Sequence, residues 1–339
     1  RETDFAMPSP KLKEALAVGG IALAAVAAIL YRQIVQKRSP RASWLRTISF
    51  NGKWEKFVAV DPSQLLVITD FDGTITAGDA NQCHDLVGTC PLLSQAFRDE
   101  FAPLLDWTTN TSIDGVEWWD KAHELMLKHG VPPRALLQRL VREARMPPRP
   151  GVLQLLEKLA AMNVPVLIVS AGLSDVIEEW LRLHEALTEN VTVCSNRLNY
   201  GADSEPQSVS PQPPVTSFTK AATYKMAGAF FRHHMARRMI MVLGDSVSDI
   251  DAAQEVPYDE SLSIGFLNSR PPTAMTKYAD TFDAVVLGNG GSLVPLIELV
   301  ELIEANGRVV EMELANRKRH LKMSRSFADF LSTVDGPIS

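Results

Sequence analysis

A short apolar run that ends in two aspartates is the feature that most constrains this 339-residue chain. Residues 65–69 read LLVIT and lead directly into Asp70, Phe71, Asp72 and Gly73. The aliphatic run indicates a buried strand, and Asp-Gly indicates the turn that ends it. Two carboxylates this close repel each other unless a cation or a shared proton relieves them. The pattern therefore predicts either an ordinary strand-to-turn boundary or a charged site at the end of a buried strand.

Further apolar runs alternate with helical segments after this first strand. The next strands are predicted near residues 164–172, 191–195, 239–246, 262–266 and 283–287, with helices between them and a closing helix over 292–305. Strands that alternate with helices predict a parallel sheet with helices on both faces. Between the first and second strands the pattern is helical only, as expected for an insertion. The predicted fold class is therefore α/β, a Rossmann-like parallel-sheet core with an inserted all-helical cap subdomain.

These elements predict the boundaries of the parts. We expect an N-terminal hydrophobic anchor and basic linker over 1–60, the core over 61–76 and 150–305, the cap over 77–149, and a charged tail over 306–339. A Pro- and Ser-rich stretch, 199–216, is predicted to be a loop. A helix is predicted to follow it over 219–234.

The N-terminal segment Ala15–Tyr31 carries no charge and has Lys and Arg residues on both sides. It is short for a bilayer span, although Ile34 and Val35 extend it. A single-pass membrane anchor is our first interpretation, and the basic residues after it predict that the body lies on the cytoplasmic face. The alternatives are a secretory signal, an organelle transit sequence, or a protein of the cytoplasm.

Charge and cysteine content limit the function classes. The net charge is −6, and ten Lys and Arg against four Asp and Glu in residues 1–60 leave −12 for the rest of the chain. An acidic body argues against a nucleic-acid-binding surface, so we expect no nucleic acid partner. The three cysteines, Cys83, Cys90 and Cys194, include no CxxC pair, which indicates reduced thiols. Cys83-His84 has no second ligand pair, so a zinc site is not expected.

Four carboxylates follow predicted strands of the core. Asp70 and Asp72 end the first strand, and the sequence GDSVSD brings Asp245 and Asp249 after a later one. Ligands of open parallel sheets bind where the carboxyl ends of the strands meet. Two acidic strand ends at one place make an all-oxygen site that suits Mg²⁺.

A hydroxyl and a cation complete the predicted set. Ser170 ends the second core strand in the sequence VSAG, and Lys220 begins a predicted helix. A serine at a strand end is often only a cap, and a lysine is often only a surface charge. Beside the acidic cluster, however, the two are the groups needed to bind phosphate oxygens.

The sequences DFDGT, VSAG and GDSVSD, with Lys220 between the last two, resemble the signature motifs of haloacid dehalogenase-superfamily phosphatases in the same chain order. Within that superfamily the chain is similar to the type-III cytosolic 5′-nucleotidases, also called pyrimidine 5′-nucleotidases. The resemblance extends through VEWWDKAH, IVSAGLSDVIEE and SIGFLNSRPPTAMTKYADTFDAVV, and covers about residues 60–303.

The resemblance implies a Mg²⁺-dependent enzyme that hydrolyses nucleoside 5′-monophosphates, pyrimidines preferred, through an aspartyl-phosphate. Asp70 would be the nucleophile and Asp72 the general acid and base. The metal would be held by Asp70, the backbone carbonyl of Asp72 and Asp245. Asp249 would orient the metal's waters or position Lys220.

The resemblance also implies a set of substrate contacts. Thr74, Ser170, the Ala171 backbone and Lys220 would bind the phosphoryl oxygens, and Glu117 matches a family residue that contacts the nucleoside. The alternatives are a phosphatase of the same superfamily that acts on a sugar phosphate or a phosphoamino acid, or a catalytically silent, membrane-tethered interaction protein. Transfer of the phosphoryl group to another hydroxyl is left open as a side reaction.

Overall fold

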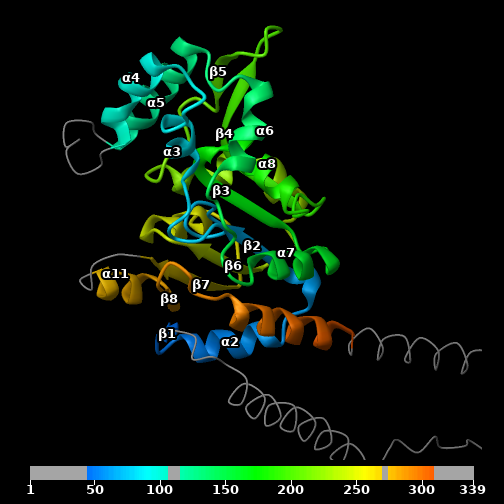
Figure 1. Ribbon diagram of the computed structural model, residues 1–339. Helices are drawn as coiled ribbons and strands as arrows, with labels where there is room; N and C mark the ends of the chain where they lie inside the picture. Colours follow the sequence, from blue (N-terminus) through cyan, green and yellow to red (C-terminus); the bar gives the residue numbers. More distant parts are fainter. Residues whose placement is uncertain (1–43, 106–114, 269–273, 309–339) are drawn as a thin grey trace, which may run out of the picture. The chain divides into compact units, whose positions relative to one another are not determined.

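The structure is a computed structural model that describes residues 44–105, 115–268 and 274–308 (Figure 1). Within these residues an eight-stranded sheet has the order β1-β8-β7-β6-β2-β3-β4-β5. The strands are β1 (Trp44–Arg46), β2 (Leu65–Thr69), β3 (Val166–Leu173), β4 (Val191–Tyr200), β5 (Pro206–Ser210), β6 (Met239–Gly244), β7 (Glu260–Leu267) and β8 (Ala284–Leu287). The strands from β8 to β4 are parallel, and the edge strands β1 and β5 are antiparallel to their neighbours. The predicted α/β class with a Rossmann-like core is confirmed.

The predicted first strand, β2, lies at the centre of the sheet between β6 and β3. All five of its residues are buried, because helices cover both faces. Successive side chains of a strand point to opposite faces, and Leu65 and Val67 accordingly belong to one hydrophobic cluster while Leu66 and Ile68 belong to another. The Asp70 amide donates to the Leu243 carbonyl of β6 at 2.9 Å, which extends the ladder and places Asp70 at the carboxyl edge of the sheet.

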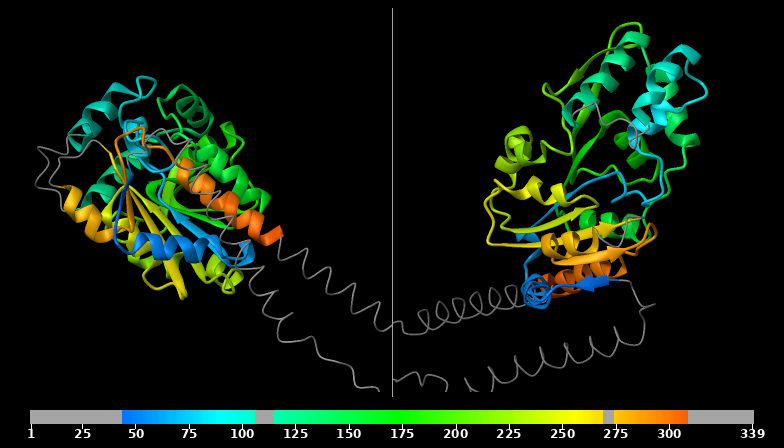
Figure 2. Two further views of the ribbon diagram at one scale, coloured as in Figure 1. Left: turned by 90° about the horizontal axis from the view of Figure 1, so that it is seen from below. Right: turned by 90° about the vertical axis from the view of Figure 1, so that its left-hand side faces the viewer.

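Helices pack on both faces of the sheet (Figure 2). The helices of the core are α2 (Phe50–Val58), η1 (Pro62–Gln64), α7 (Val152–Ala161), α8 (Ser174–Leu183), η2 (Lys220–Ala222), α9 (Thr223–Met226), α10 (Gly228–His233), η3 (Val247–Ala253), α11 (Ala274–Thr281) and a last helix over 294–308. Residues of α2, α7, α8 and the last helix cover the Leu65 face, and residues of α10 and η3 cover the Leu66 face. The closing helix predicted over 292–305 is present with slightly later bounds.

The cap consists of helices inserted between β2 and β3, as predicted (Figure 1). Its described helices are α3 (Cys83–Gly88), α4 (Gln95–Leu105), α5 (Gly115–His129) and α6 (Arg134–Glu143). The two chain segments that join cap to core lie against each other, since Thr76 and Pro148 form an antiparallel bridge and the Ala77 amide donates to the Pro147 carbonyl at 2.9 Å. The core also reaches the cap, because β5 contacts α5.

Two local predictions after β3 are wrong. Residues 199–216 were predicted to be a loop, but β4 continues to Tyr200 and pairs with β5. The pairing buries Leu198 and Val209, which lie opposite each other. The free energy gained from this burial outweighs the low strand propensity of a Pro- and Ser-rich segment. The single helix predicted over 219–234 is divided into η2, α9 and α10.

The predicted N-terminal linker is also wrong in part. Its last section forms β1, which pairs with β8, and α2, which lies beside the last helix (Figure 1). The predicted anchor at 15–31 and the tail after 308 lie outside the described residues. Among the residues that the structure describes, no helix combines the length and the apolar character needed to cross a bilayer.

A chain that begins at Pro62 is expected to be less stable than one that begins at Ser43. The shorter chain lacks Phe50 and Phe57, which are 2% and 0% exposed in the core. Burial of each phenyl ring contributes roughly 1.5–3 kcal/mol, so the free energy of unfolding should fall by more than about 3 kcal/mol. Urea unfolding of the two chains measures the difference, and equal midpoints would show that β1 and α2 are dispensable.

Candidate active site

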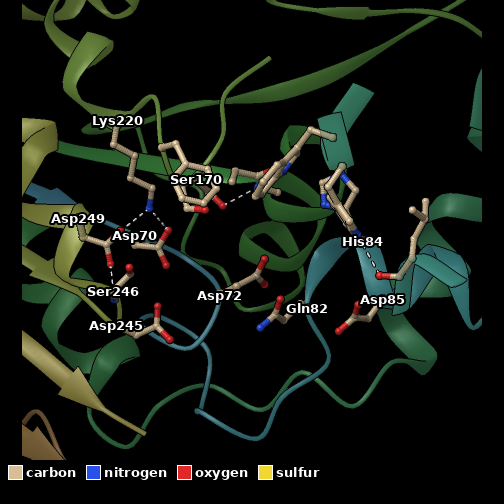
Figure 3. A pocket seen from close by; sticks show the side chains of 17 residues that line it. Asp70, Asp72, Gln82, His84, Asp85, Ser170, Lys220, Asp245, Ser246 and Asp249 are labelled. Atoms are coloured by element: carbon tan, nitrogen blue, oxygen red, sulfur yellow. Dashed lines mark hydrogen bonds and ion pairs between the residues drawn. The ribbon is translucent and has the colours of Figure 1, made fainter. Parts of the chain in front are cut away.

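A pocket of about 660 Å³ opens at the carboxyl edge of the sheet, between core and cap (Figure 3). Its core residues are Asp70, Asp72, Ser170, Ala171, Gly172, Ser217, Phe218, Lys220, Asp245, Ser246 and Asp249, and its cap residues are Gln82, His84, Asp85, Leu104, Trp118 and Trp119. The structure thus brings together residues that follow β2 with residues of β3, η2 and η3, up to about 180 positions apart in the sequence.

Lys220 joins two of the predicted aspartates. Its ammonium group donates to Asp70 Oδ1 and to Asp249 Oδ1, both at 2.6 Å, and all three side chains are buried. Burial opposes the charge of Lys220, but the two carboxylates raise its pKa above the usual range. Burial also raises the pKa of Asp70 to about 6, against the opposing effect of the Lys220 charge. Lys220 therefore remains a cation in the floor of the pocket.

Asp72 has a different environment from Asp70. Its Oδ2 accepts a hydrogen bond from the Cys83 amide at 3.2 Å, and its Oδ1 lies 3.5 Å from Cys83 Sγ. Removal from water raises the pKa of Asp72 to about 7, and the charge of Asp70 adds to the effect. Burial keeps the Cys83 thiol protonated by raising its pKa, so the thiol can donate to Asp72. Near neutral pH, Asp72 can therefore both hold and release a proton.

Three carboxylates form a group that can hold a cation. Oxygen atoms of Asp70, Asp245 and Asp249 all lie within 4.8 Å of one another. Opposite ligands of an octahedral Mg²⁺ are about 4.2 Å apart, so the spacing and the all-oxygen character fit that ion. Asp249 also accepts at Oδ2 from the Ser246 amide at 2.8 Å and at Oδ1 from Lys220. Both of its oxygens are thus already bonded, which favours the predicted role of positioning Lys220.

The predicted phosphate contacts divide into two groups. Ser170, Ala171 and Lys220 line the pocket. Thr74 is 1% exposed and is not among the lining residues, and its hydroxyl has no hydrogen-bond partner among the residues that the structure describes. Ser170 Oγ accepts from the Gly172 amide at 3.0 Å and keeps its proton for another acceptor.

The cap presents aromatic residues to the pocket rather than the predicted acid. Glu117 is exposed on α5 and lies outside the pocket lining, whereas Trp118 and Trp119 line it. Neighbouring positions of a helix point about 100° apart, so the three cannot all face one way. Trp119 Nε1 donates to the Ala171 carbonyl at 2.9 Å and thereby joins cap to core. Phe218, 68% exposed, lies edge-on to Trp119 with 6.4 Å between ring centroids.

Several residues of the site escaped the sequence analysis. Cys83 and His84 were considered only as a zinc pair, yet Cys83 contacts Asp72 and His84 lines the pocket. His84 Nε2 lies 3.2 Å from His123 Nε2, and burial lowers the pKa of both rings, that of His123 to about 4. Cys83 and His84 begin the first cap helix after the turn that carries Asp72, and this position was a signal in the sequence. No local sequence pattern, however, indicated which of the two side chains would face Asp72.

Comparison with known proteins yields one family and several relatives. A family model described as pyrimidine 5′-nucleotidase (UMPH-1) matches residues 80–304. The 7-methylguanosine phosphate-specific 5′-nucleotidase of Gallus gallus is 31% identical over 241 residues, which are 66% of this chain and 83% of that protein. The protein of the same name from Homo sapiens is 28% identical over 267 residues, 74% of this chain and 88% of the relative.

Among solved structures, the chain is similar to the crystal structure of cytosolic 5′-nucleotidase IIIB bound to cytidine. The TM-score is 0.66 at 24% sequence identity, and the match covers 80% of this chain and 96% of that one. The fold described above is therefore shared with that protein.

Proposed function

Because the chain belongs to the pyrimidine 5′-nucleotidase family of phosphoric monoester hydrolases, we propose that it hydrolyses nucleoside 5′-monophosphates with Mg²⁺. The observation that carries the proposal is the Asp70–Lys220–Asp249 chain of hydrogen bonds in the floor of a pocket whose cap side is aromatic. The floor suits a phosphoryl group, and the wall suits a flat base. A sugar phosphate or phosphoamino acid would leave that wall without a partner, so these alternatives are second.

Two aspartates carry the chemistry in this proposal. A carboxylate oxygen of Asp70 bonds to phosphorus while the bond from phosphorus to the ribose oxygen breaks, and Asp72 gives its proton to that oxygen. Water then bonds to phosphorus and gives a proton to Asp72, and the Asp70–phosphorus bond breaks to release phosphate. Lys220 and Ser170 bind phosphoryl oxygens in both steps, and Lys220 also holds Asp70 in place.

Mg²⁺ fits the acidic group described above. Asp70, Asp245 and the backbone carbonyl of Asp72 would hold it, and when bound it would offset the negative charge of the phosphoryl group. Thr74 stays a predicted phosphate contact. Its buried hydroxyl has no hydrogen-bond partner within the described part of the chain, which is the observation in favour of that role.

A phosphate-release screen tests the proposal directly. Pyrimidine monophosphates are tested first, because the matching family is described as pyrimidine 5′-nucleotidase. 7-Methylguanosine monophosphate is included, because two relatives are named as specific for 7-methylguanosine phosphate. Phosphoserine and a hexose phosphate represent the alternatives. Release from nucleotides well above release from the other two is expected, and the reverse order would contradict the proposed substrate class.

We propose that the activity lies in the cytoplasm, because a relative from Caenorhabditis elegans that is 28% identical over 262 residues is named a putative cytosolic 5′-nucleotidase. The anchor predicted at 15–31 stays a prediction, and it is compatible with this location if the body faces the cytoplasm.

Mg²⁺ is expected to raise the melting temperature more at about pH 8 than at about pH 5.5. The folded-state pKa values of about 6 for Asp70 and about 7 for Asp72 exceed the ordinary value of 3.8. The metal-free folded protein thus binds more protons than the unfolded chain, so the contribution of these groups to stability falls as pH rises from about 4 to about 7. Metal ligands must be ionised, so Mg²⁺ offsets this loss only at the higher pH.

Thermal unfolding with and without Mg²⁺ at the two pH values measures this effect. The Asp245→Asn variant is the control, because it lacks one ligand and should lose most of the shift at the higher pH. A shift of equal size at both pH values would contradict ligation by these carboxylates.

Glu117→Ala is expected to raise the KM for nucleotides by about 10-fold, the effect of one hydrogen bond to a charged group. Glu117 is exposed, so the contact requires the cap helices to close on the bound nucleotide. Hydrolysis of p-nitrophenyl phosphate, which has no nucleoside, should not change. Glu124→Ala, at another exposed position of α5, is the matched control. An unchanged KM for nucleotides would leave the aromatic wall as the nucleoside contact.

A further inference from the structure

Arg149 is a buried cation that the proposed mechanism does not use. It lies in the second of the two chain segments that join the cap to the core, called linkers below, and it is 1% exposed. Its backbone amide donates to the Ile75 carbonyl at 2.9 Å, so the two linkers are joined at this residue. Its guanidinium carbon lies 4.3 Å from the centre of the Phe266 ring. The side chain is therefore fixed between the linker and the end of β7.

The guanidinium group holds the turn that carries Asp72. Arg149 Nε donates to the Thr74 carbonyl at 2.9 Å, and Nη2 donates to the Gly73 carbonyl at 2.5 Å. Nη1 donates to two further carbonyls, those of Asn289 at 3.4 Å and Gly291 at 3.3 Å. One planar fork thus ties the catalytic turn to the loop after β8, which an ammonium group could not do with the same geometry.

Arg149 also reaches Asp245 through one intervening side chain. Arg149 Nη2 donates to Asn268 Oδ1 at 2.8 Å, and Asn268 Nδ2 donates to Asp245 Oδ2 at 3.1 Å. Arginine can only donate and an ionised carboxylate can only accept, so the chain of hydrogen bonds requires this orientation of the Asn268 amide. Asn268 Nδ2 is also 3.0 Å from the Gly73 carbonyl, so the same amide bonds the turn and Asp245.

The turn and Asp245 are in direct contact as well. Gly73 has a φ of +71°, and a Cβ atom at this position would lie 2.7 Å from Asp245 Oδ2. Glycine is therefore required both for the backbone conformation and for the close approach. A shift of the turn would move the carboxylate that it touches.

The buried charge of Arg149 is stabilised by the carboxylate of Asp245. Its hydrogen-bond acceptors named above are all neutral, and a buried cation without a carboxylate partner is costly. Burial lowers the pKa of Arg149 to about 10, and the charge of Asp245 acts in the opposite direction. The group remains charged at neutral pH, and Asp245 is the carboxylate that stabilises it.

We propose that Arg149 is a positioning residue for the metal site, which acts through Asn268 on the Asp245 carboxylate and through two carbonyls on the turn that bears Asp72. This inference rests on the proposed metal dependence of the enzyme. Partners that orient a metal ligand typically change metal affinity by about 10–100-fold when they are removed. Arg149 thus affects how tightly the divalent cation binds rather than how the nucleoside is recognised.

Direct binding of Mn²⁺, followed by its electron paramagnetic resonance signal, tests the proposal without a measurement of activity. Arg149→Lys keeps the charge but loses the fork, and its Kd for Mn²⁺ is expected to rise by about 10–100-fold. At saturating metal, the KM for a nucleotide should stay within about twofold of the wild-type value. Asn268→Ala removes the link to Asp245 and should show the same loss of affinity if Arg149→Lys fails to fold.

Arg237→Lys is the matched control. Arg237 also donates to backbone carbonyls, those of Pro62, Leu65 and Asn163, but Leu65 begins β2 at the edge of the sheet opposite to the pocket. This variant should lose stability and keep the wild-type Kd for Mn²⁺. If the folded Arg149→Lys or Asn268→Ala protein binds Mn²⁺ as the wild type does, the inference is wrong although the proposed function stands. If the wild-type chain binds no Mn²⁺, the proposed metal dependence is wrong and the inference falls with it.

Discussion

Replacement of Asp70 by asparagine is expected to reduce phosphate release by about 10⁴-fold or more, the scale on which loss of a nucleophile acts. The amide cannot form a stable bond to phosphorus, and one carboxylate of the cation-binding group disappears at the same time. Asparagine has nearly the same shape as aspartate, and its Oδ1 can still accept from Lys220. Lys220 also keeps its bond to Asp249, so the fold should be preserved.

Release of phosphate from the preferred nucleotide of the screen, with Mg²⁺ at saturation, measures this effect. Asp259→Asn is the matched control, because Asp259 is exposed and pairs with Arg238 away from the pocket. Trapping of a phosphorylated protein by acid quench should succeed with the wild type and fail with Asp70→Asn. Normal turnover by Asp70→Asn would rule out the aspartyl-phosphate mechanism.

Asp72→Asn is expected to lower kcat for nucleotides by about 10²–10⁴-fold, the usual effect of a lost general acid and base. Asp72 has an elevated pKa of about 7, so the native side chain can carry the proton that the ribose oxygen needs near neutral pH. Asparagine cannot supply this proton. The contacts with Cys83 permit the substitution, because the amide oxygen can accept from the Cys83 backbone in place of Oδ2.

Two substrates with different leaving groups distinguish an acid role of Asp72 from a structural role. The p-nitrophenolate ion leaves readily without a proton, so formation of the phosphorylated enzyme from p-nitrophenyl phosphate should be impaired much less than from a nucleotide. A rapid burst of p-nitrophenol followed by slow turnover is the expected signature, since the second step still needs a base. If the burst is lost to the same degree as nucleotide turnover, Asp72 supports the site in another way.

The sequence alone was sufficient to predict the fold class of the core and the edge of the sheet at which the site lies. Aliphatic runs such as LLVIT have the length and composition of strands buried on both faces, and helical segments between them require parallel connections. Parallel strands bring their carboxyl ends to one edge, so Asp70, Ser170 and Asp245 were predicted to meet there without any knowledge of distances. Lys220 and Asp249 joined the set through the motifs around them.

The sequence was less informative where contacts between distant segments decide the conformation. Residues 44–58 have a basic, linker-like composition, but Phe50 and Phe57 are buried in the core. The Pro- and Ser-rich stretch after β4 forms a strand because Leu198 and Val209 bury each other. In both places, burial of a few apolar residues outweighs the average composition of the segment.

The side chains that orient the catalytic groups were decided only by the tertiary structure. Arg149 contacts a carbonyl 75 residues earlier, Cys83 contacts a carboxylate 11 residues earlier, and α5 presents Trp118 and Trp119 rather than Glu117 to the pocket. A residue that bonds backbone carbonyls leaves no pattern in the sequence, because every residue offers the same carbonyl group. The sequence therefore determined which groups can react and at which edge of the sheet they meet, and the packing of cap, linker and turn determined how those groups are held.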